Sequence, residues 1–395
     1  MMRDTISTFI NKYRKELVEF VIPFWEKHSI DTTHGGFYNS LDRDGSVFDT
    51  EKYMWMQWRE VYTWATLAMS EYAMKEKGKW LGFARQGFDF LHARGRDAAG
   101  NYYFVISEDG EPIVAPYNIF TESFAVMGSA ALFKATGEQR YKDAALEAMD
   151  HYIARIDDPK GKWNKRLPTG QRRLSHGPYM ILANLGTVIK DNLGISDYEA
   201  KVKESVDIVI DKFWSDEHQA LFENINEDFT IDLSSCDGRH LNPGHGLESA
   251  WFVLQHAERN QRPNLIPKAC KIIKALLDRG WDKEYGGIYY FMDVLGKPHV
   301  ELSWDMKLWW VHCEALVATL MAYRMTGDGA FWTWFTRLDG WTWAHFPDEK
   351  YGEWYAYLNR RGEPTHALKG GRWKCFFHLP RALMTCIDEL KKIRI

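Results

Sequence analysis

The start of the last predicted helix carries a residue suited to proton transfer. The stretch K-G-G-R-W-K-C-F-F-H-L-P-R, from Lys369 to Arg381, places His378 at that start. Pro380 suits a first helical turn because its missing N–H would have no partner there, and the Gly370–Gly371 pair allows a tight turn before it. Imidazole titrates near neutral pH, so His378 is a candidate proton carrier. A lone histidine here can also serve only as a cap or a packing residue.

A second histidine stands at another predicted helix start. The stretch N-P-G-H-G-L-E-S-A-W-F places His245 and Glu248 three residues apart on one helix face. The partial positive charge of a helix N-terminus disfavours imidazolium and tends to keep a histidine neutral. We expect Glu248 to orient His245 and to set its tautomer. Two histidines that face each other across a substrate suit removal of a proton from one face and its return to the other.

Other polar and aromatic groups occur at corresponding helix starts. Permanently charged arginines can stabilise an enediolate oxygen, and an indole offers a sugar ring a flat apolar face. In S-W-D-M-K-L-W-W-V-H-C-E-A-L, three polar or aromatic residues are expected to share one helix face, namely Lys307, Trp310 and Glu314. Each group alone has a structural explanation, but together they indicate a site. With the two histidines, the candidates are Arg59, Glu122, Glu248, Trp309, Trp310, Glu314 and Arg381, with His176 and Lys307 as additions.

The elements that carry these residues repeat along the chain. A glycine-and-aromatic pattern that ends in a turn, such as Y-G-G-I-Y-Y-F-M-D-V-L-G, occurs six times, with a weak third copy from Gly161. Alternating apolar and polar residues before Asp-Gly, Leu-Gly or Arg-Gly predict a short β-hairpin in each copy. The copies lie 66, 60, 59, 66 and 66 residues apart, measured at Phe37, Tyr103, Trp163, Phe222, Ile288 and Trp354.

Between successive copies, apolar residues recur at helical spacing and leave room for two helices. The predicted pairs span residues 53–73 and 80–93, 121–135 and 139–156, 177–191 and 198–213, 244–259 and 265–279, and 302–326 and 330–346. The sixth copy is followed by one helix, 377–393, whose partner is the N-terminal helix, 6–27. Because the two terminal helices complete a sixth pair, we expect the ring to close.

Helices that alternate in direction would place every helix that follows a hairpin with its N-terminus at one end of the ring. The candidate residues would then meet at one mouth. The helices that follow a hairpin are also the more aromatic set, and we assign them to the inner ring. No Pro/Ser-rich linker or charge block divides the chain. We therefore predict an all-α fold, an (α/α)6 barrel of twelve helices with short β-hairpins at one mouth, formed by residues 1–395 as one domain.

Composition excludes several functional classes. A net charge of −4 gives no general attraction to nucleic acid. Five cysteines without C-x-x-C spacing argue against a disulfide framework or a zinc cluster, and reduced thiols suit a cytoplasmic protein. The N-terminus lacks the apolar block of a signal peptide, and no run reaches the ~18 apolar residues that span a bilayer. We expect a cytoplasmic protein that acts on a small molecule.

Competing chemistries remain open at this point. Glu122, Glu248 and Glu314 would allow an inverting glycoside hydrolase, which needs an acid and a base roughly 6.5–9.5 Å apart. A metal site is not expected, because no H-E-x-x-H occurs and a single H-x-x-E is common by chance. No standard phosphate loop is visible. A scaffold without enzymatic activity would not need five polar groups around one mouth.

The chain resembles the N-acylglucosamine 2-epimerase family, which includes the renin-binding protein and is related to the cellobiose 2-epimerases. The resemblance covers essentially the whole length. Five stretches carry it: G-G-F-Y-N-S-L-D-R-D-G, N-P-G-H-G-L-E-S-A-W-F, M-K-L-W-W-V-H-C-E-A-L, Y-G-E-W-Y-A-Y-L-N-R-R-G-E and K-G-G-R-W-K-C-F-F-H-L-P-R-A-L.

The resemblance implies an (α/α)6 barrel that interconverts sugars differing only at C2. The sugar ring opens, the C2 proton is removed to give an enediolate, and the opposite face is reprotonated. The family's two acid/base histidines match His245 and His378. The residues that would hold the substrate and the enediolate match Arg59, Glu248, Glu314 and Arg381. No cofactor is needed for this chemistry.

The third inner helix departs from the cellobiose 2-epimerases, whose H-x-H segment is replaced here by L-S-H-G-P-Y-M-I-L-A-N-L with His176 slightly upstream. The Pro-Tyr-Met segment is more similar to the N-acyl sugar branch, whose members are often activated by ATP. ATP is thus a candidate activator, and the basic loop Thr169–Ser175 is either a phosphate site or a solvated turn. We expect interconversion of N-acetylglucosamine and N-acetylmannosamine; the alternatives are mannose and glucose, a β-1,4-linked disaccharide such as cellobiose, or glycoside hydrolysis. A homodimer is one candidate assembly.

Overall fold

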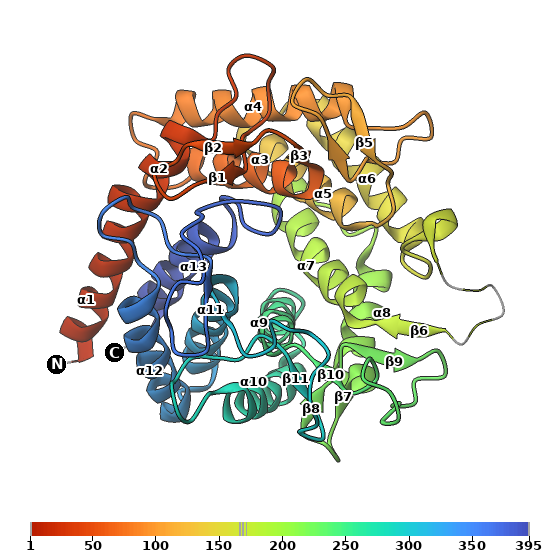
Figure 1. The fold of residues 1–395 in the computed structure, drawn as a ribbon, viewed down its shortest axis with the longest axis vertical. Helices are drawn as coiled ribbons and strands as arrows, with labels where there is room; N and C mark the ends of the chain where they lie inside the picture. The colour runs from red at the N-terminus through yellow and green to blue at the C-terminus, as the bar shows by residue number, and fades with distance from the viewer. Residues whose placement is uncertain (1, 166, 168–169, 171, 394–395) are drawn as a thin grey trace.

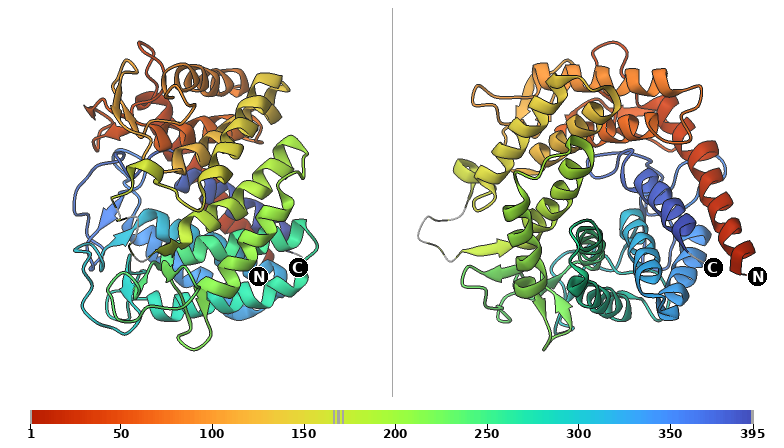
Figure 2. Two further views of the ribbon diagram at one scale, coloured as in Figure 1. Left: turned by 90° about the vertical axis from the view of Figure 1, so that its right-hand side faces the viewer. Right: turned by 180° about the vertical axis from the view of Figure 1, so that it is seen from behind.

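Two concentric rings of helices form the protein (Figure 1). The structure, a computed structural model, describes residues 2–165, 167, 170 and 172–393. The chain passes once around the ring, and its two ends lie side by side in all views (Figures 1 and 2). The predicted (α/α)6 barrel is therefore confirmed. Two residues of the basic loop, Thr169 and Gln171, lie outside the described residues.

The inner ring is apolar on all sides. All residues from 121 to 132 and from 309 to 322 are buried, because these helices pack against both inner neighbours and an outer helix. Within the described chain, the inner helices are α3 (Met54–Ala68), α5 (Phe120–Thr136), α7 (His176–Leu193), α9 (Pro243–Arg259), α11 (Trp309–Thr326) and α13 (His378–Lys392).

The outer helices bury one face only. In α10 the buried residues recur at helical spacing, as Ile272, Ile273, Leu276 and Leu277 do. The N-terminal helix, predicted at 6–27, is one helical run with a π-helical turn in its middle. The outer ring contains α1 (Met2–Lys15), η1 (Glu16–Val21), α2 (Ile22–His28), α4 (Lys77–Arg94), α6 (Gln139–Arg155), α8 (Glu199–Ile208), η3 (Val209–Phe213), α10 (Ile266–Gly280) and α12 (Gly329–His345).

Short strands gather at one end of the ring (Figure 2). Their pairs are all antiparallel. The strands are β1 (Ser40–Leu41), β2 (Val47–Asp49), β3 (Lys52–Tyr53), β4 (Val105–Ile106), β5 (Pro112–Val114), β6 (Arg173–Ser175), β7 (Trp214–Ser215), β8 (Ala220–Leu221), β9 (Asn224–Asn226), β10 (His240–Leu241), β11 (Met292–Asp293), β12 (Lys307–Leu308) and β13 (Tyr357–Leu358).

The strand pairing differs from six local hairpins. Local hairpins β1–β2, β4–β5 and β7–β8 form, whereas the described residues of the weak third copy form a 3-10 turn, η2 (Gly161–Trp163). A second 3-10 turn, η4 (Pro263–Leu265), precedes α10. Pairs β3–β4, β6–β9, β10–β11 and β12–β13 instead join the strand before an inner helix to the next repeat. This cross-repeat pairing holds the starts of four inner helices in place.

One predicted helix was too long for the same reason. The fifth inner helix, expected from residue 302, begins at Trp309, because Lys307 and Leu308 form a strand whose partners are Leu358 and Tyr357. Lys307 therefore does not share a helix face with Glu314.

Backbone hydrogen bonds close the ring. The N–H groups of Lys369 and Gly370, in the segment before α13, donate to the carbonyl of Leu41 at 2.9 and 3.1 Å. A Cβ at Gly370 would lie 2.0 Å from the carbonyl oxygen of Asn39, so only glycine fits at this approach. The last repeat is thus joined to the first hairpin directly beside the segment that leads to His378.

A strained glutamate reinforces this closure. Glu353 has a φ of 57°, at a place where two other copies have Gly36 and Gly287 with φ of 73° and 72°. Its carboxylate accepts from Trp25 Nε1 at 2.6 Å and from Lys374 Nζ at 2.8 Å, and all three side chains are buried. These hydrogen bonds link the N-terminal helix, the sixth copy and the segment before α13. Their free energy offsets the backbone strain at Glu353.

Replacing this carboxylate should destabilise the protein. We expect Glu353→Ala to lower the free energy of unfolding by about 3–5 kcal/mol, because the buried Lys374 ammonium would lose its counter-charge. Glu204→Ala removes an exposed pair with Lys201 and should cost under about 1 kcal/mol. Denaturant unfolding followed by circular dichroism compares the two. Equal losses would contradict a ring-closing role for Glu353.

Candidate active site

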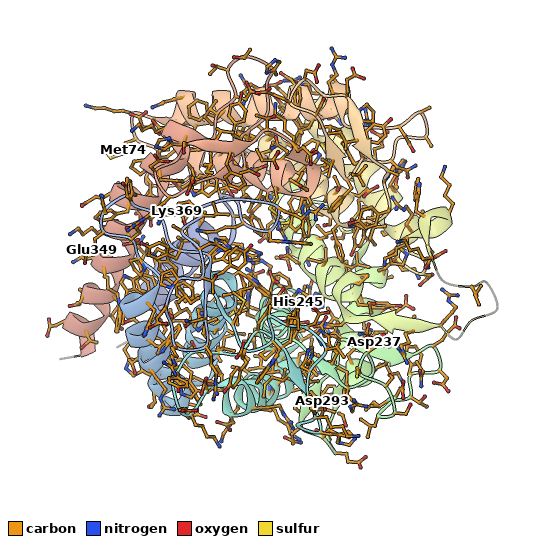
Figure 3. All side chains as sticks on the ribbon, in the orientation of Figure 1. Met74, Asp237, His245, Asp293, Glu349 and Lys369 are labelled. Atoms are coloured by element: carbon orange, nitrogen blue, oxygen red, sulfur yellow. The ribbon has the colours of Figure 1, made fainter. Side chains whose placement is uncertain are left out.

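A cavity of about 550 Å³ opens at the end of the ring where the strands lie. The first turns of all six inner helices named above contribute to its wall, together with loop residues. His245, labelled near the centre of the ring in Figure 3, is part of this wall. The helix residues that line the cavity are Trp55, Arg59, Phe120, Phe124, Gly177, Met180, Ile181, Asn184, His245, Glu248, Trp309, Trp310, His378 and Arg381.

His245 is held by a carboxylate that the sequence analysis missed. Asn242 caps α9 by accepting from the His245 backbone N–H at 3.2 Å, and Pro243 occupies the first turn. The imidazole Nδ1 lies 3.1 Å from both carboxylate oxygens of Glu223, which follows β8. Nδ1 therefore carries a proton and donates it to Glu223, and Nε2 is left for the cavity.

This ion pair sets the charge of His245. Burial alone would lower the pKa of His245, but the Glu223 carboxylate outweighs it and raises the pKa above its ordinary value. The pKa of Glu223 is lowered, because the two imidazoles of His245 and His176 outweigh its burial. The expectations that the helix start keeps His245 neutral and that Glu248 orients it were therefore wrong. A charge in direct contact exceeds the partial charge of a helix end.

His378 belongs to a different network, centred on a buried arginine. Its Nδ1 donates to Glu314 Oε1 at 2.8 Å, which leaves Nε2 with a free lone pair. Arg381 Nη2 donates to the same Glu314 oxygen at 2.7 Å and to Glu248 Oε1 at 2.5 Å. Trp251 Nε1 donates to the second Glu314 oxygen at 2.8 Å. Three neighbouring helices, α9, α11 and α13, thus meet at one guanidinium.

The charges around His378 keep it neutral. Burial and the positive charge of Arg381 lower the pKa of His378 well below its usual value, although Glu248 opposes the shift. The expectation of a neutral histidine at this helix start is met for His378. The cavity therefore contains one histidine that favours the proton-bearing form and one that favours the free base.

Trp310 lies close to both histidines. Its ring centroid is 5.3 Å from that of His245 and 5.6 Å from that of His378, with interplanar angles of 41° and 39°. Trp309 also lines the cavity, 6.3 Å from His378. Both imidazoles therefore lie beside the same apolar indole, which is a suitable surface for a sugar.

Arg59 is a cation without a carboxylate partner among the described residues. Its guanidinium carbon lies 4.0 Å from the ring centroid of Phe124, 5.0 Å from that of Trp55 and 5.1 Å from that of Phe377. Its Nε has no hydrogen-bond partner among the residues that the structure describes. Burial lowers the pKa of Arg59 to about 10, so the group stays charged at neutral pH. A buried cation facing a cavity suits an anionic oxygen.

Some predicted residues lie outside the cavity wall. Glu122 faces the outer ring, where Arg155 Nη1 lies 2.7 Å away, and burial raises the pKa of Glu122 to about 7. Lys307 is fully buried and pairs with Asp282 at 3.1 Å. Glu122 thus pairs with Arg155 and Lys307 with Asp282, and neither residue lines the cavity, so both assignments are corrected. Glu314 does not line the cavity either; it accepts hydrogen bonds from His378 and Arg381, which do line it.

The cavity also contains residues that the sequence analysis did not single out. Tyr290 and Tyr357 come from the fifth and sixth glycine-aromatic copies, so the repeat itself could have pointed to them. Asn184 is the polar residue of L-A-N-L on α7, two turns beyond His176. Phe291 belongs to the same fifth copy as Tyr290, whereas the other loop residues carried no periodic signal; they include Glu301, Ser303, Met306 and Trp373.

One group of side chains has the composition of a metal site. Glu248, Glu314 and His378 offer ligand atoms within 4.8 Å of one another. Arg381 Nη2 lies within 2.7 Å of both carboxylates, so a fixed cation already binds them, and its positive charge would repel a metal ion. In the described chain, no helix is both long and apolar enough to cross a bilayer.

Comparisons with known proteins agree with this geometry. The N-acylglucosamine 2-epimerase of Bos taurus is 37% identical over 99% of this chain and 93% of its own length. The human N-acylglucosamine 2-epimerase is 36% identical over 98% of this chain and 91% of its own length.

Solved structures share the fold. A cellobiose 2-epimerase from Spirochaeta thermophila superposes with a TM-score of 0.83 at 19% identity and covers 100% of this chain and 99% of its own. The family described as N-acylglucosamine 2-epimerase (GlcNAc 2-epimerase) matches residues 35–382. With two full-length relatives above one-third identity and a family match over most of the sequence, this chain belongs to the N-acylglucosamine 2-epimerase family.

Proposed function

We propose that this protein is a carbohydrate 2-epimerase that interconverts N-acetyl-D-glucosamine and N-acetyl-D-mannosamine. The observation that carries the proposal is the pair of histidines beside Trp310, one favouring imidazolium and the other the free base. Inversion at one carbon needs a base on one face and an acid on the other at the same time. The full-length identity to N-acylglucosamine 2-epimerases supports the choice of substrate.

The reaction follows from the positions of these groups. In the open-chain sugar, the proton on C2 is acidic because the carbonyl at C1 accepts the electron pair. The free Nε2 of His378 removes this proton, the C2–H bond breaks, and negative charge develops on the C1 oxygen. Arg59, which has no carboxylate of its own, stabilises that enolate oxygen. His245 then donates its Nε2 proton to the opposite face of C2, which gives the epimer.

The wall formed by α5 and α7 suits an N-acyl group. Phe120, Phe124, Met180 and Ile181 give an apolar surface, across the ring from α11 and α13. Asn184 adds an amide that can exchange hydrogen bonds with the amide of the substrate. An acetyl group on nitrogen therefore finds both an apolar and a polar contact.

A glycoside hydrolase is disfavoured by the carboxylates. Of the three that would have allowed it, Glu122 and Glu314 do not line the cavity, and Glu248 is bound to Arg381. An inverting hydrolase needs one protonated and one free carboxyl group facing the substrate.

Proton NMR of N-acetylmannosamine in D2O tests the reaction directly. We expect N-acetylglucosamine to appear with deuterium at C2, because the new bond takes its hydrogen from His245, whose exchangeable N–H carries deuterium in D2O. Parallel tubes with mannose and with cellobiose test the alternative substrates. Epimerisation of one of those sugars alone would refute the N-acetyl substrate, and cleavage of cellobiose without exchange would refute the epimerase.

Loss of either histidine should stop turnover. We expect His378→Asn and His245→Asn to lower kcat at least about 100-fold, because each removes a proton carrier. His218→Asn, at a histidine that does not line the cavity, should keep wild-type activity. Folding of each variant is checked by thermal unfolding. A folded His378→Asn protein with near-normal kcat would remove His378 from the mechanism.

The pH dependence should reflect the opposite states of the two histidines. His378 acts as free base, and since its pKa is lowered, activity should persist on the acid side until His378 is protonated. His245 acts as imidazolium, and since its pKa is raised, activity should fall only above the ordinary histidine range. In Glu223→Gln, the carboxylate that opposes the effect of burial on His245 is lost, so the pKa of His245 should fall. The alkaline limb of kcat/KM should then move down by about one pH unit or more. An unmoved limb would contradict the Glu223–His245 pair.

Proton transfer by these side chains needs no redox or phosphate chemistry. ATP remains a prediction as an activator, and adding ATP to the NMR tubes tests it. A cytoplasmic location and a homodimer likewise remain predictions from the sequence.

A further inference from the structure

The carboxylate that holds His245 also faces a second, fully buried histidine. His176, the first residue of α7, has no exposed surface, and its Nδ1 lies 3.6 Å from Glu223 Oε1. Its backbone N–H donates to the carbonyl of Glu223 at 2.9 Å, which ties the two residues together. His176 is absent from the cavity wall, so it does not touch the substrate.

The second ring nitrogen of His176 sets its tautomer. Nε2 lies 3.1 Å from the hydroxyl of Ser249, which sits one helical turn beyond His245 on α9. A hydroxyl can rotate to donate, so Ser249 can give its proton to Nε2 and leave the ring proton on Nδ1, facing Glu223.

That Nδ1 has no hydrogen-bond partner among the described residues. A buried N–H without an acceptor is costly. A shift of a few tenths of an ångström by Glu223 would complete the bond, since 3.6 Å is just beyond hydrogen-bond distance. Glu223 is therefore placed to be shared between two imidazoles on different helices.

We propose that His176 is a positioning residue that acts through Glu223 on the acid His245. The inference rests on the proposed epimerisation. When His245 gives its proton to C2, Glu223 loses its charged partner but remains buried. The Nδ1–H of His176 then stabilises the carboxylate as a second donor, which makes proton release from His245 easier. Two lines of donors thus converge on Glu223, one from His245 and the other from Ser249 through His176.

The charged and titratable groups around these donors stay unchanged in the variants below. Glu223 is faced by His176 and His245, and it also acts on Tyr290 and His240. Around His245, the groups from all packed elements are Glu223, Glu248, Arg59, His378 and His240. A change in the titration of His245 in a His176 variant is therefore assigned to the lost donor.

Two substitutions at His176 separate the hydrogen bond from the packing. His176→Leu fills similar space without a donor, whereas His176→Asn places an amide N–H near the position of Nδ1. We would titrate the Cε1–H signal of His245 by NMR in protein labelled on histidine, assigned with His245→Asn. We expect His176→Leu to raise the pKa of His245 by about half a pH unit and His176→Asn to stay close to wild type.

Kinetics give an independent readout. In His176→Leu we expect kcat to fall roughly three- to tenfold with KM within about twofold, because proton release slows while substrate contacts remain. The alkaline limb of the pH profile should move upward with the pKa of His245. Ser249→Ala should change kcat and the alkaline limb in the same direction as His176→Leu but by less. The imidazole of His176 remains in this variant, but its tautomer is no longer set by Ser249.

Three results would overturn the proposal. One is an unchanged His245 titration in folded His176→Leu; another is an equal shift in His176→Leu and His176→Asn, which would show a packing effect. The third is a raised KM with kcat unchanged, which would show a role in substrate binding. The titration needs no substrate, so it tests these lines of donors even if wild-type protein fails to epimerise N-acetylmannosamine, the result that would refute the proposed function.

Discussion

The guanidinium of Arg381 is the interaction on which the site depends most. It comes from α13 and lies 2.5 Å from Glu248 on α9 and 2.7 Å from Glu314 on α11, so one buried cation joins three neighbouring inner helices. Removing the guanidinium would leave two buried carboxylates without their counter-charge, which costs far more than loss of a surface pair. Because Glu314 also holds the Nδ1 of His378, the orientation of the proposed base is coupled to the packing of the ring.

Two histidines at equivalent helix starts acquire opposite character from their partners. His245 stands beside the carboxylate of Glu223, whereas His378 stands beside the guanidinium of Arg381 and shares its carboxylate, Glu314, with it. Both histidines stand in the first turn of an inner helix, so their charged partners decide the difference. An acid and a base thus coexist in one cavity at one pH, which is what inversion of a carbon centre requires.

Local pattern predicted the fold well. The repeat and the helical periodicity gave twelve helical segments, their order and the closed ring. The errors came where long-range pairing overrides local pattern: residues 302–308 are not helical, because Lys307 and Leu308 pair with a strand some fifty residues away. Likewise, the described residues of the third glycine-aromatic copy form a turn, and four strand pairs join successive repeats. No periodicity within one segment reports on such partners.

By itself, the sequence determined which chemical groups stand at the helix starts. Local backbone preferences fix where each helix begins, and the spacing along the chain then places His245, His378, Arg59 and Arg381 near those starts. Only the tertiary structure decided which carboxylate serves which base. Glu223 lies 22 residues from His245, and Glu314 lies 64 residues from His378, so closure of the ring, and not helical spacing, brings them together. Burial then fixes their charges: the free energy of an ionised group depends on all its neighbours in space, and one segment of sequence contains only a few of them.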